Sequence, residues 1–179
     1  MACAGWSTRG ENSSVLYNQY NGRQLADSLC AALNAEVLNH GMDNKGKPCT
    51  PSVRRKAAAK AYAEAARAGN KWAQYNYALC LYSGSGVERN LEEAVKFWQQ
   101  AAEQGLPWAS YNLACCYARG EGVPQDYAKA VELWQQAADA GIGAAMMNLA
   151  ICHHRGLGVP QDEAKAEACL KSAVTAPKQ

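Results

Sequence analysis

The 179-residue sequence predicts an all-α protein, an α/α solenoid of stacked antiparallel helix pairs. The first observation behind this prediction is composition. The chain holds 35 Ala against 9 Val and 2 Ile, and Ala favours helices whereas β-branched residues favour strands. The second is an internal repeat, because 17 of the 36 residues in 69–104 are identical to their equivalents in 105–140. Self-similarity at this period is typical of stacked repeat architectures.

Three blocks align without a gap, at residues 69–104, 105–140 and 141–175. Each block has one Gly, one Ala, one Asn and one Cys in register and then a Gly-x-Gly-Val turn. The equivalent residues are Gly69, Gly105 and Gly141; Ala73, Ala109 and Ala145; Asn76, Asn112 and Asn148; Cys80, Cys116 and Cys152; and the glycine pairs at 84/86, 120/122 and 156/158. We therefore expect each block to be one structural unit.

Each block predicts two helices, which we call the A helix and the B helix. In the second block the A helix covers 107–119, with Pro107 in the first turn, where a missing N–H costs nothing. The Gly-x-Gly-Val turn ends it. The B helices run for about 14 residues after the capping residues Asn90, Asp126 and Asp162. Asn90 followed by Glu93 is typical of a capping box.

Small and large residues recur at fixed places in these helices. Ala73, Ala94 and Ala101 have equivalents in the following blocks and predict close approach of neighbouring helices. Trp98 and Trp134 fill the wider gaps, and Leu170 replaces them in the third block. One helix pair cannot cover its own apolar face, so stability has to come from stacking.

The pattern from Ala109 to Gly141, Ala-x-Tyr-Asn-Leu-Ala-x-x-Tyr-x-x-Gly-x-Gly-Val-Pro-Gln-Asp-x-x-Lys-Ala-x-x-x-Trp-x-x-Ala-Ala-x-x-Gly, resembles the Sel1-like repeat, a relative of the tetratricopeptide repeat. The resemblance covers 69–175. The chain departs from it at Ala78, Ala114 and Ala150, where Gly is usual, and at His153, where a large residue such as Tyr is usual.

The remaining segments extend this organisation upstream. Residues 52–68 match a B helix, and 22–40 predict an A helix that has lost the pattern, so 22–68 form a degenerate first pair with a Gly/Pro loop at 41–51. We expect a flexible N-terminal segment at 1–21 and a short tail at 176–179.

The resemblance implies a right-handed superhelix whose A helices line a concave groove. Helix periodicity places Leu113, Ala114 and Tyr117 inside, so the other faces of the A helices are the candidates for binding. The candidate groove residues are Trp72, Tyr75, Asn76, Tyr82, Trp108, Tyr111, Asn112, Arg119, Met147, Asn148, His154 and Arg155, with Leu79, Cys115 and Ile151 in the same register. Aromatic residues and Arg often carry interface energy, and Asn suits a peptide backbone.

This surface predicts an interaction with a peptide that is acidic near Arg119 and Arg155. The alternative is structural: each Asn bonds only a neighbouring helix, and Trp72 and Trp108 pack against the preceding repeat.

Other chemistries find little support in the sequence. Cys80, Cys116 and Cys152 recur one repeat apart, too far for a disulfide, and are interpreted as small buried residues; a Cys152–Cys169 bridge stays open. Cys152-His153-His154 cannot place three ligands on one metal ion, because successive helical residues point about 100° apart. The Gly-x-Gly turns lack the third Gly of a nucleotide loop, and no catalytic constellation stands out, so no cofactor is expected.

The charge distribution and the targeting signals limit the kinds of partner and the location that the sequence predicts. Residues 45–71 carry +8 −1 = +7, but no aromatic ladder accompanies them, so we interpret them as a solvated helix face and expect no nucleic-acid partner. The absence of signal, transit and membrane-spanning segments predicts a cytoplasmic protein that does not enter a membrane.

The sequence therefore predicts a non-catalytic protein-protein interaction module, an adaptor or scaffold. One alternative is a structural subunit or assembly factor of a larger complex; another is a small-ligand-binding or hydrolytic protein. A monomer is expected, with the C-terminal face as the place where an oligomer could form.

Overall fold

The computed structural model describes residues 51–175, and this part of the chain contains seven α-helices and no strand. A B-type helix, α2 (Pro51–Arg67), precedes three helix pairs. The A helices are α3 (Lys71–Ser83), α5 (Pro107–Arg119) and α7 (Gly143–Arg155), and the B helices are α4 (Leu91–Glu103), α6 (Tyr127–Asp139) and α8 (Glu163–Thr175). The predicted segments 1–21, 22–40 and 176–179, and the loop up to residue 50, lie outside the described residues.

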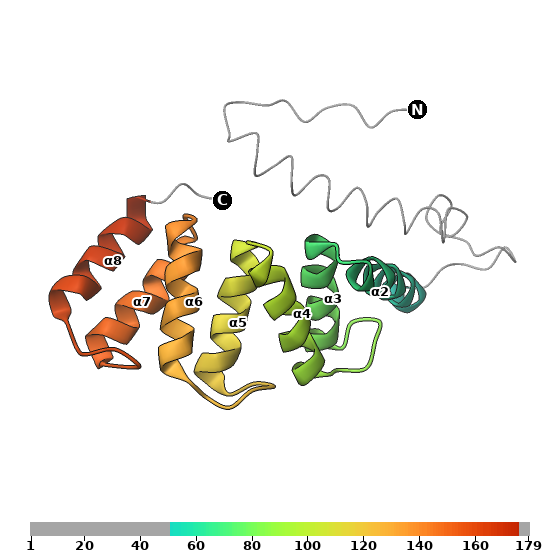
Figure 1. Cartoon of the computed structure of the whole chain (residues 1–179), viewed down its shortest axis with the longest axis horizontal. Helices are drawn as coiled ribbons and strands as arrows, with labels where there is room; N and C mark the ends of the chain where they lie inside the picture. The colour runs from blue at the N-terminus through green and yellow to red at the C-terminus, as the bar shows by residue number, and fades with distance from the viewer. Residues whose placement is uncertain (1–50, 176–179) are drawn as a thin grey trace, which may run out of the picture.

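The helices follow one another in space as they do in the sequence (Figure 1). Each A helix packs on its own B helix, and each B helix packs on the next A helix, as in α4 with α5 and α6 with α7. The main contacts are thus between neighbours along the chain, as stacking of repeats requires. The predicted all-α repeat fold is confirmed.

Polar side chains cap the N-termini of several helices. Asn90 Oδ1 accepts from Glu93 N at 3.0 Å, and Asp126 Oδ1 accepts from Lys129 N at 3.1 Å, as the sequence predicts. The capping box at Asn90 is only half formed. The backbone N–H of Asn90 donates to Leu81 O of the A helix, so Glu93 accepts from the Asn90 side chain instead, at 3.4 Å.

The two glycines of each Gly-x-Gly turn have different tasks. The first ends the A helix in the left-handed region, as at Gly120 with φ 70°. The second lies against the preceding B helix, where a Cβ on Gly122 would be 2.5 Å from Leu91 O. Gly158 approaches the first residues of α6 in the same way, and Gly86 approaches the backbone of α2 at Arg55 and Lys56. This second glycine therefore joins one repeat to the one before it.

The core combines small residues within pairs with large ones between pairs. Ala73, Ala94 and Ala101 are fully buried, so helix axes approach closely. Trp98 and Trp134 are 2% and 5% exposed and fill the spaces between successive pairs. Among the described residues the indole N–H of Trp98 has no hydrogen-bond partner, so this side chain acts through apolar packing.

Candidate functional site

The candidate residues lie on the faces of α3, α5 and α7 that do not enter the core; we call this the A-helix surface. Leu113 and Ala114 are buried, while Arg119, Met147, His154 and Arg155 are exposed. The other candidates are half-buried: Trp72, Tyr75, Asn76, Tyr82, Trp108, Tyr111, Asn112 and Asn148.

Two of the three Asn residues of this surface, Asn112 and Asn148, interact with tyrosines of the preceding repeat. Burial raises the pKa of Tyr75, and the side chain of Asn112, which can donate to the tyrosine oxygen, partly offsets that rise. Tyr111 has a pKa raised first by burial, with Asn148 opposing the rise in the same way. Asn112 and Asn148 are thus engaged between repeats, which favours the structural interpretation of these two residues.

Three large apolar side chains of the A-helix surface are exposed. Leu79, Met147 and Ile151 are 37%, 51% and 48% exposed. The ring of Trp108 meets Tyr111 edge-on, with centroids 6.3 Å apart. The surface is therefore an apolar and aromatic strip, and the sequence signal for it was the shared register of Leu79 and Ile151 with the candidate residues.

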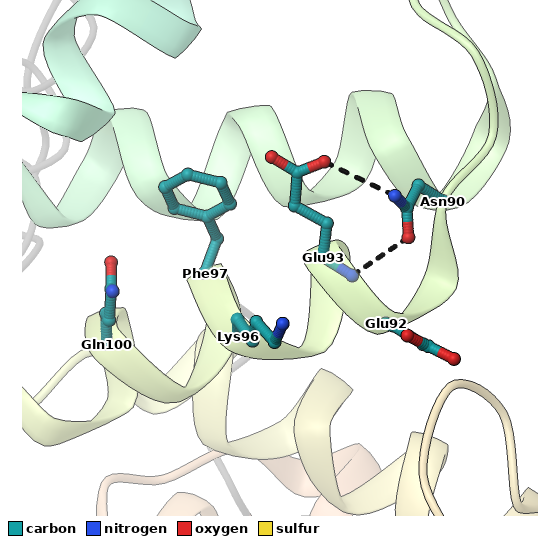
Figure 2. A pocket seen from close by; sticks show the side chains of 6 residues that line it. All are labelled: Asn90, Glu92, Glu93, Lys96, Phe97 and Gln100. Carbon is teal, nitrogen blue, oxygen red and sulfur yellow. Dashed lines mark hydrogen bonds between the residues drawn. The ribbon is translucent and has the colours of Figure 1, made fainter.

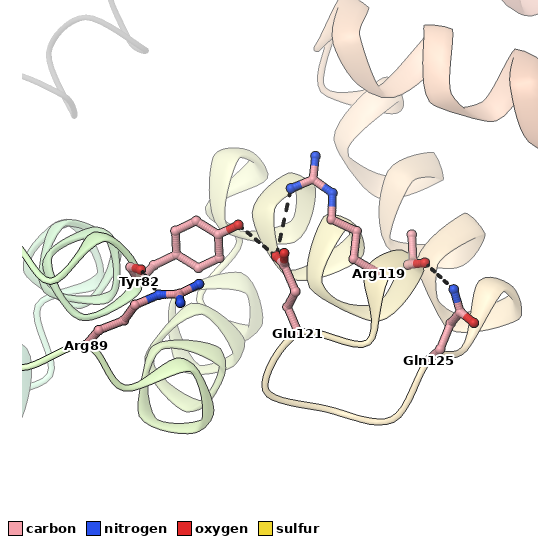
Figure 3. A network of polar contacts seen from close by, with 6 residues as sticks. Tyr82, Arg89, Arg119, Glu121 and Gln125 are labelled. Atoms are coloured by element: carbon pink, nitrogen blue, oxygen red, sulfur yellow. Dashed lines mark hydrogen bonds and ion pairs between the residues drawn. The ribbon is translucent and has the colours of Figure 1, made fainter.

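A polar network lies beside this strip, at the ends of α3 and α5 (Figure 3). The Tyr82 hydroxyl donates to Glu121 Oε2 at 2.7 Å, and Arg119 lies 3.8 Å from the same carboxylate. The hydrogen bond to Glu121 is the first cause of a raised pKa at Tyr82. Arg89 donates from Nε to Tyr82 O at 3.0 Å within the first repeat, and the bond between Tyr82 and Glu121 joins the first repeat to the second.

The two arginines of the candidate site consequently differ. Glu121 lies beside Arg119 and partly neutralises it. The equivalent of Glu121 in the third repeat is Leu157, and Arg155 forms no ion pair with another described residue. Arg155 is therefore the more available cation for an acidic ligand.

His154 points toward α8 instead of along the strip. Its Nδ1 lies 2.8 Å from Glu163 Oε2, with both side chains largely exposed. This contact lies within the third helix pair, so it is local to that pair. His154 thus contacts its own B helix, unlike the aromatic candidates of the first two repeats, which form the strip.

The B-helix side has a hollow of about 340 Å³ next to α4. Figure 2 shows its labelled side chains, among them Asn90 and Glu93, whose hydrogen bonds form the helix cap. Phe97 packs edge-on against Tyr77, with ring centroids 5.0 Å apart. Two of its polar side chains, Asn90 and Glu93, are engaged in the helix cap, so it is a weaker candidate than the A-helix surface.

The thiols of the described residues are all free, including Cys152 and Cys169. Cys116 and Cys152 are buried, and burial raises the pKa of Cys116 to about 12. Within residues 51–175, no three His, Cys, Asp or Glu side chains are grouped as metal ligands.

The basic stretch continues along α2 into the described region. Arg54, Lys56, Lys60 and Arg67 are exposed, and none forms an ion pair with another residue between 51 and 175. Lys71 donates to Gln104 O at 3.5 Å. The exposure of the four α2 side chains agrees with the interpretation of the stretch as solvated.

The fold and the A-helix surface together place this chain in the class of α/α repeat proteins, whose stacked helices form an extended surface. The family model described as Sel1 repeat matches residues 73–106, 109–142 and 143–176. The chain therefore belongs to the Sel1 repeat family, whose members are generally non-catalytic and mediate protein-protein interactions. No curated protein matches the sequence significantly.

Solved structures show the same fold. A protective antigen of uropathogenic Escherichia coli, c5321, described as displaying an SLR fold, is 26% identical with a TM-score of 0.70 over 91% of this chain. A Sel1 repeat protein from Oxalobacter formigenes is 26% identical, with a TM-score of 0.67 over 91% of this chain. This chain spans only 31% and 60% of the lengths of those two proteins.

Helicobacter pylori cysteine rich protein B is 21% identical, with a TM-score of 0.55 over 70% of this chain and 90% of its own, which shows the fold alone. Among the described helices, none is long and apolar enough to cross a bilayer.

Proposed function

We propose that this chain is a non-catalytic adaptor or scaffold that binds a peptide segment of a partner protein along its A-helix surface. The observation that carries the proposal is the exposure of Leu79 and Met147 on the surface that also holds the half-buried aromatic candidates and the exposed Arg119 and Arg155. Large apolar side chains left in contact with water on a soluble protein mark interaction sites.

The ligand we propose has apolar side chains and at least one carboxylate. Apolar groups of the ligand would displace water from Leu79, Tyr111 and Met147. A carboxylate would pair with Arg155, which has no described ion pair, and secondarily with Arg119, where it competes with Glu121. We retain a cytoplasmic location in this proposal, since free thiols fit a reducing compartment.

A display library of random 12-residue peptides, selected on the wild-type chain, tests this function. The double variant Leu79→Ser, Met147→Ser should lose binding of the selected peptides by about tenfold or more, because both side chains are on the proposed surface. Arg155→Ala should weaken peptides that contain Asp or Glu more than their Asn or Gln versions.

The matched control is Lys96→Ala, Gln135→Ala on exposed positions of α4 and α6, which should bind as wild type does. Circular dichroism would verify that each variant is folded. If the control loses as much binding as the surface variant, or if no peptide is selected, the A-helix surface is not the binding site.

A second candidate function, a structural subunit of a larger complex, is favoured by one separate observation. Leu170 and Val174 on α8 are 50% and 86% exposed, outside the A-helix surface. Permanent association through α8 would cover them.

A further inference from the structure

The outward face of the third helix pair leaves apolar side chains uncovered. Ile151 of α7 lies beside Leu170 and Ala166 of α8 at a hollow of about 440 Å³. Leu170 and Val174 continue this apolar face along α8. We call the surface formed by Ile151, Leu170 and Val174 the end face.

The register of the repeats shows what such a face contacts elsewhere in the molecule. Leu170 is equivalent to Trp98 and Trp134, which are almost completely buried. The A helix of the following repeat packs on each of these B helices, α5 on α4 and α7 on α6, and contributes residues to the same apolar clusters. No described residue does this for Leu170, and Figure 1 shows α8 at the outer limit of the described array.

The inner interfaces also give the chemistry of the cover. Trp98 shares its apolar cluster with Leu106, Ala109 and Leu113. Trp134 shares its cluster with the equivalent residues Ile142, Ala145 and Leu149. The common motif is a large aliphatic residue before the helix, a small residue three positions later and Leu four positions after that.

In the inner repeats, the turn of the following repeat covers the position that corresponds to this hollow. Gly122 rests on the first turn of α4, and Gly158 on the first turn of α6. The hollow at the first turn of α8, which Glu163 and Ala166 line, lacks this contact among residues 51–175. Its charged residues are of both signs, Arg155 with Glu163 and Glu167, so the charge selects neither a polyanion nor a polycation.

We propose that the end face binds a helix of another polypeptide that carries the aliphatic-x-x-small-x-x-x-Leu motif, and that this helix continues the stack as a following A helix would. Because Leu170 offers less contact area than the Trp of the inner interfaces, this contact is weaker than those within the chain and suits an exchangeable partner. The end face shares Ile151 with the A-helix surface, whereas Leu170 and Val174 lie on the B helix α8, so variants of Leu170 test the end face alone.

A labelled peptide of residues 105–121 of this chain is the probe. It carries the motif as Leu106, Ala109 and Leu113, and a covalent staple across positions 111 and 115, off the packing side, keeps it helical. In fluorescence anisotropy the wild-type chain should bind it. Leu170→Trp should bind about tenfold more tightly, and Leu170→Glu at least tenfold more weakly.

Two controls accompany these variants. Val53→Glu changes another exposed apolar residue, on α2, and should leave binding unchanged. A stapled probe with Leu113→Glu should not bind. A helical probe that fails to bind wild type, or binds wild type and Leu170→Glu equally, would overturn the proposal.

Light scattering of the chain without the probe distinguishes a partner helix from a second copy of the chain as the occupant of the end face. A monomer agrees with the proposal. A dimer that Leu170→Glu dissociates, and that excludes the probe, would assign the end face to a second copy and overturn the assignment to a partner helix.

Discussion

The second and third helix pairs have the same internal packing but different outer faces. Inside the pairs, Cys116 and Cys152 are each 2% exposed. On the stacking faces, Trp134 is buried in α6 whereas its equivalent Leu170 is half exposed in α8. The difference shows that a B helix obtains much of its burial from the following repeat, as expected where stability is a sum over neighbours.

The largest expected effect on stability comes from replacing a tryptophan of the stacking face. Trp98→Ala removes a side chain enclosed by two repeats and should lower the free energy of unfolding by about 3–5 kcal/mol. Leu170→Ala removes a half-exposed side chain and should cost about 1 kcal/mol. Urea denaturation followed by circular dichroism measures both. Equal losses would mean that the following repeat contributes nothing to the burial of the B helix.

The second effect concerns the glycines that join repeats. Gly122→Ala should cost about 3 kcal/mol, because φ is 73° and the added Cβ would be 2.5 Å from Leu91 O. Gly105→Ala is the matched control: its φ is 75°, but nothing lies within 4 Å of the added Cβ, so about 1 kcal/mol is expected. Thermal unfolding of both variants would measure the difference, and a larger loss for Gly105→Ala would contradict the proposed role of the turn.

A smaller effect is expected for the Asn positions. Asn112→Ala should cost about 1 kcal/mol, because it removes the partner of Tyr75 between two repeats. Asn76→Ala, at the same register in the first repeat, should cost less, since no tyrosine of the described residues opposes it in this way. Chemical denaturation of the two variants compares them. A greater loss for Asn76→Ala would argue against the inter-repeat contact.

The smallest effect is on thiol chemistry and leaves stability unchanged. A raised pKa means less thiolate at a given pH, so at pH 8 a thiol with a pKa of about 12 is ionised in about one molecule in 10⁴. Native Cys116 should therefore resist iodoacetamide, while the less buried Cys169 on α8 reacts earlier. Peptide mapping by mass spectrometry reads each site. Cys116 reacting first would show that the second pair opens locally.

Most of the architecture could be predicted from the sequence, because the same helix start and stop residues recur in register in each repeat. Pro107, Gly120 and Asp126 specify where helices begin and end through contacts within a few residues. The binding surface was less predictable. Asn112 looked like a ligand-facing amide, yet the structure places it opposite Tyr75, a residue 37 positions earlier. Likewise, nothing local to Arg119 indicated that Glu121 would be shared with Tyr82 of another repeat.

The helix pairs, their caps and the all-α repeat fold follow from short-range periodicity and turn chemistry that the sequence repeats three times. Stacking of the pairs sets which second glycine touches which B helix, leaves Arg155 without an ion pair among residues 51–175 and leaves Leu170 half exposed. These features depend on contacts between residues about one repeat apart, and their geometry exists only once the pairs have stacked. The same dependence on a neighbour makes the end face the place where a further helix can bind.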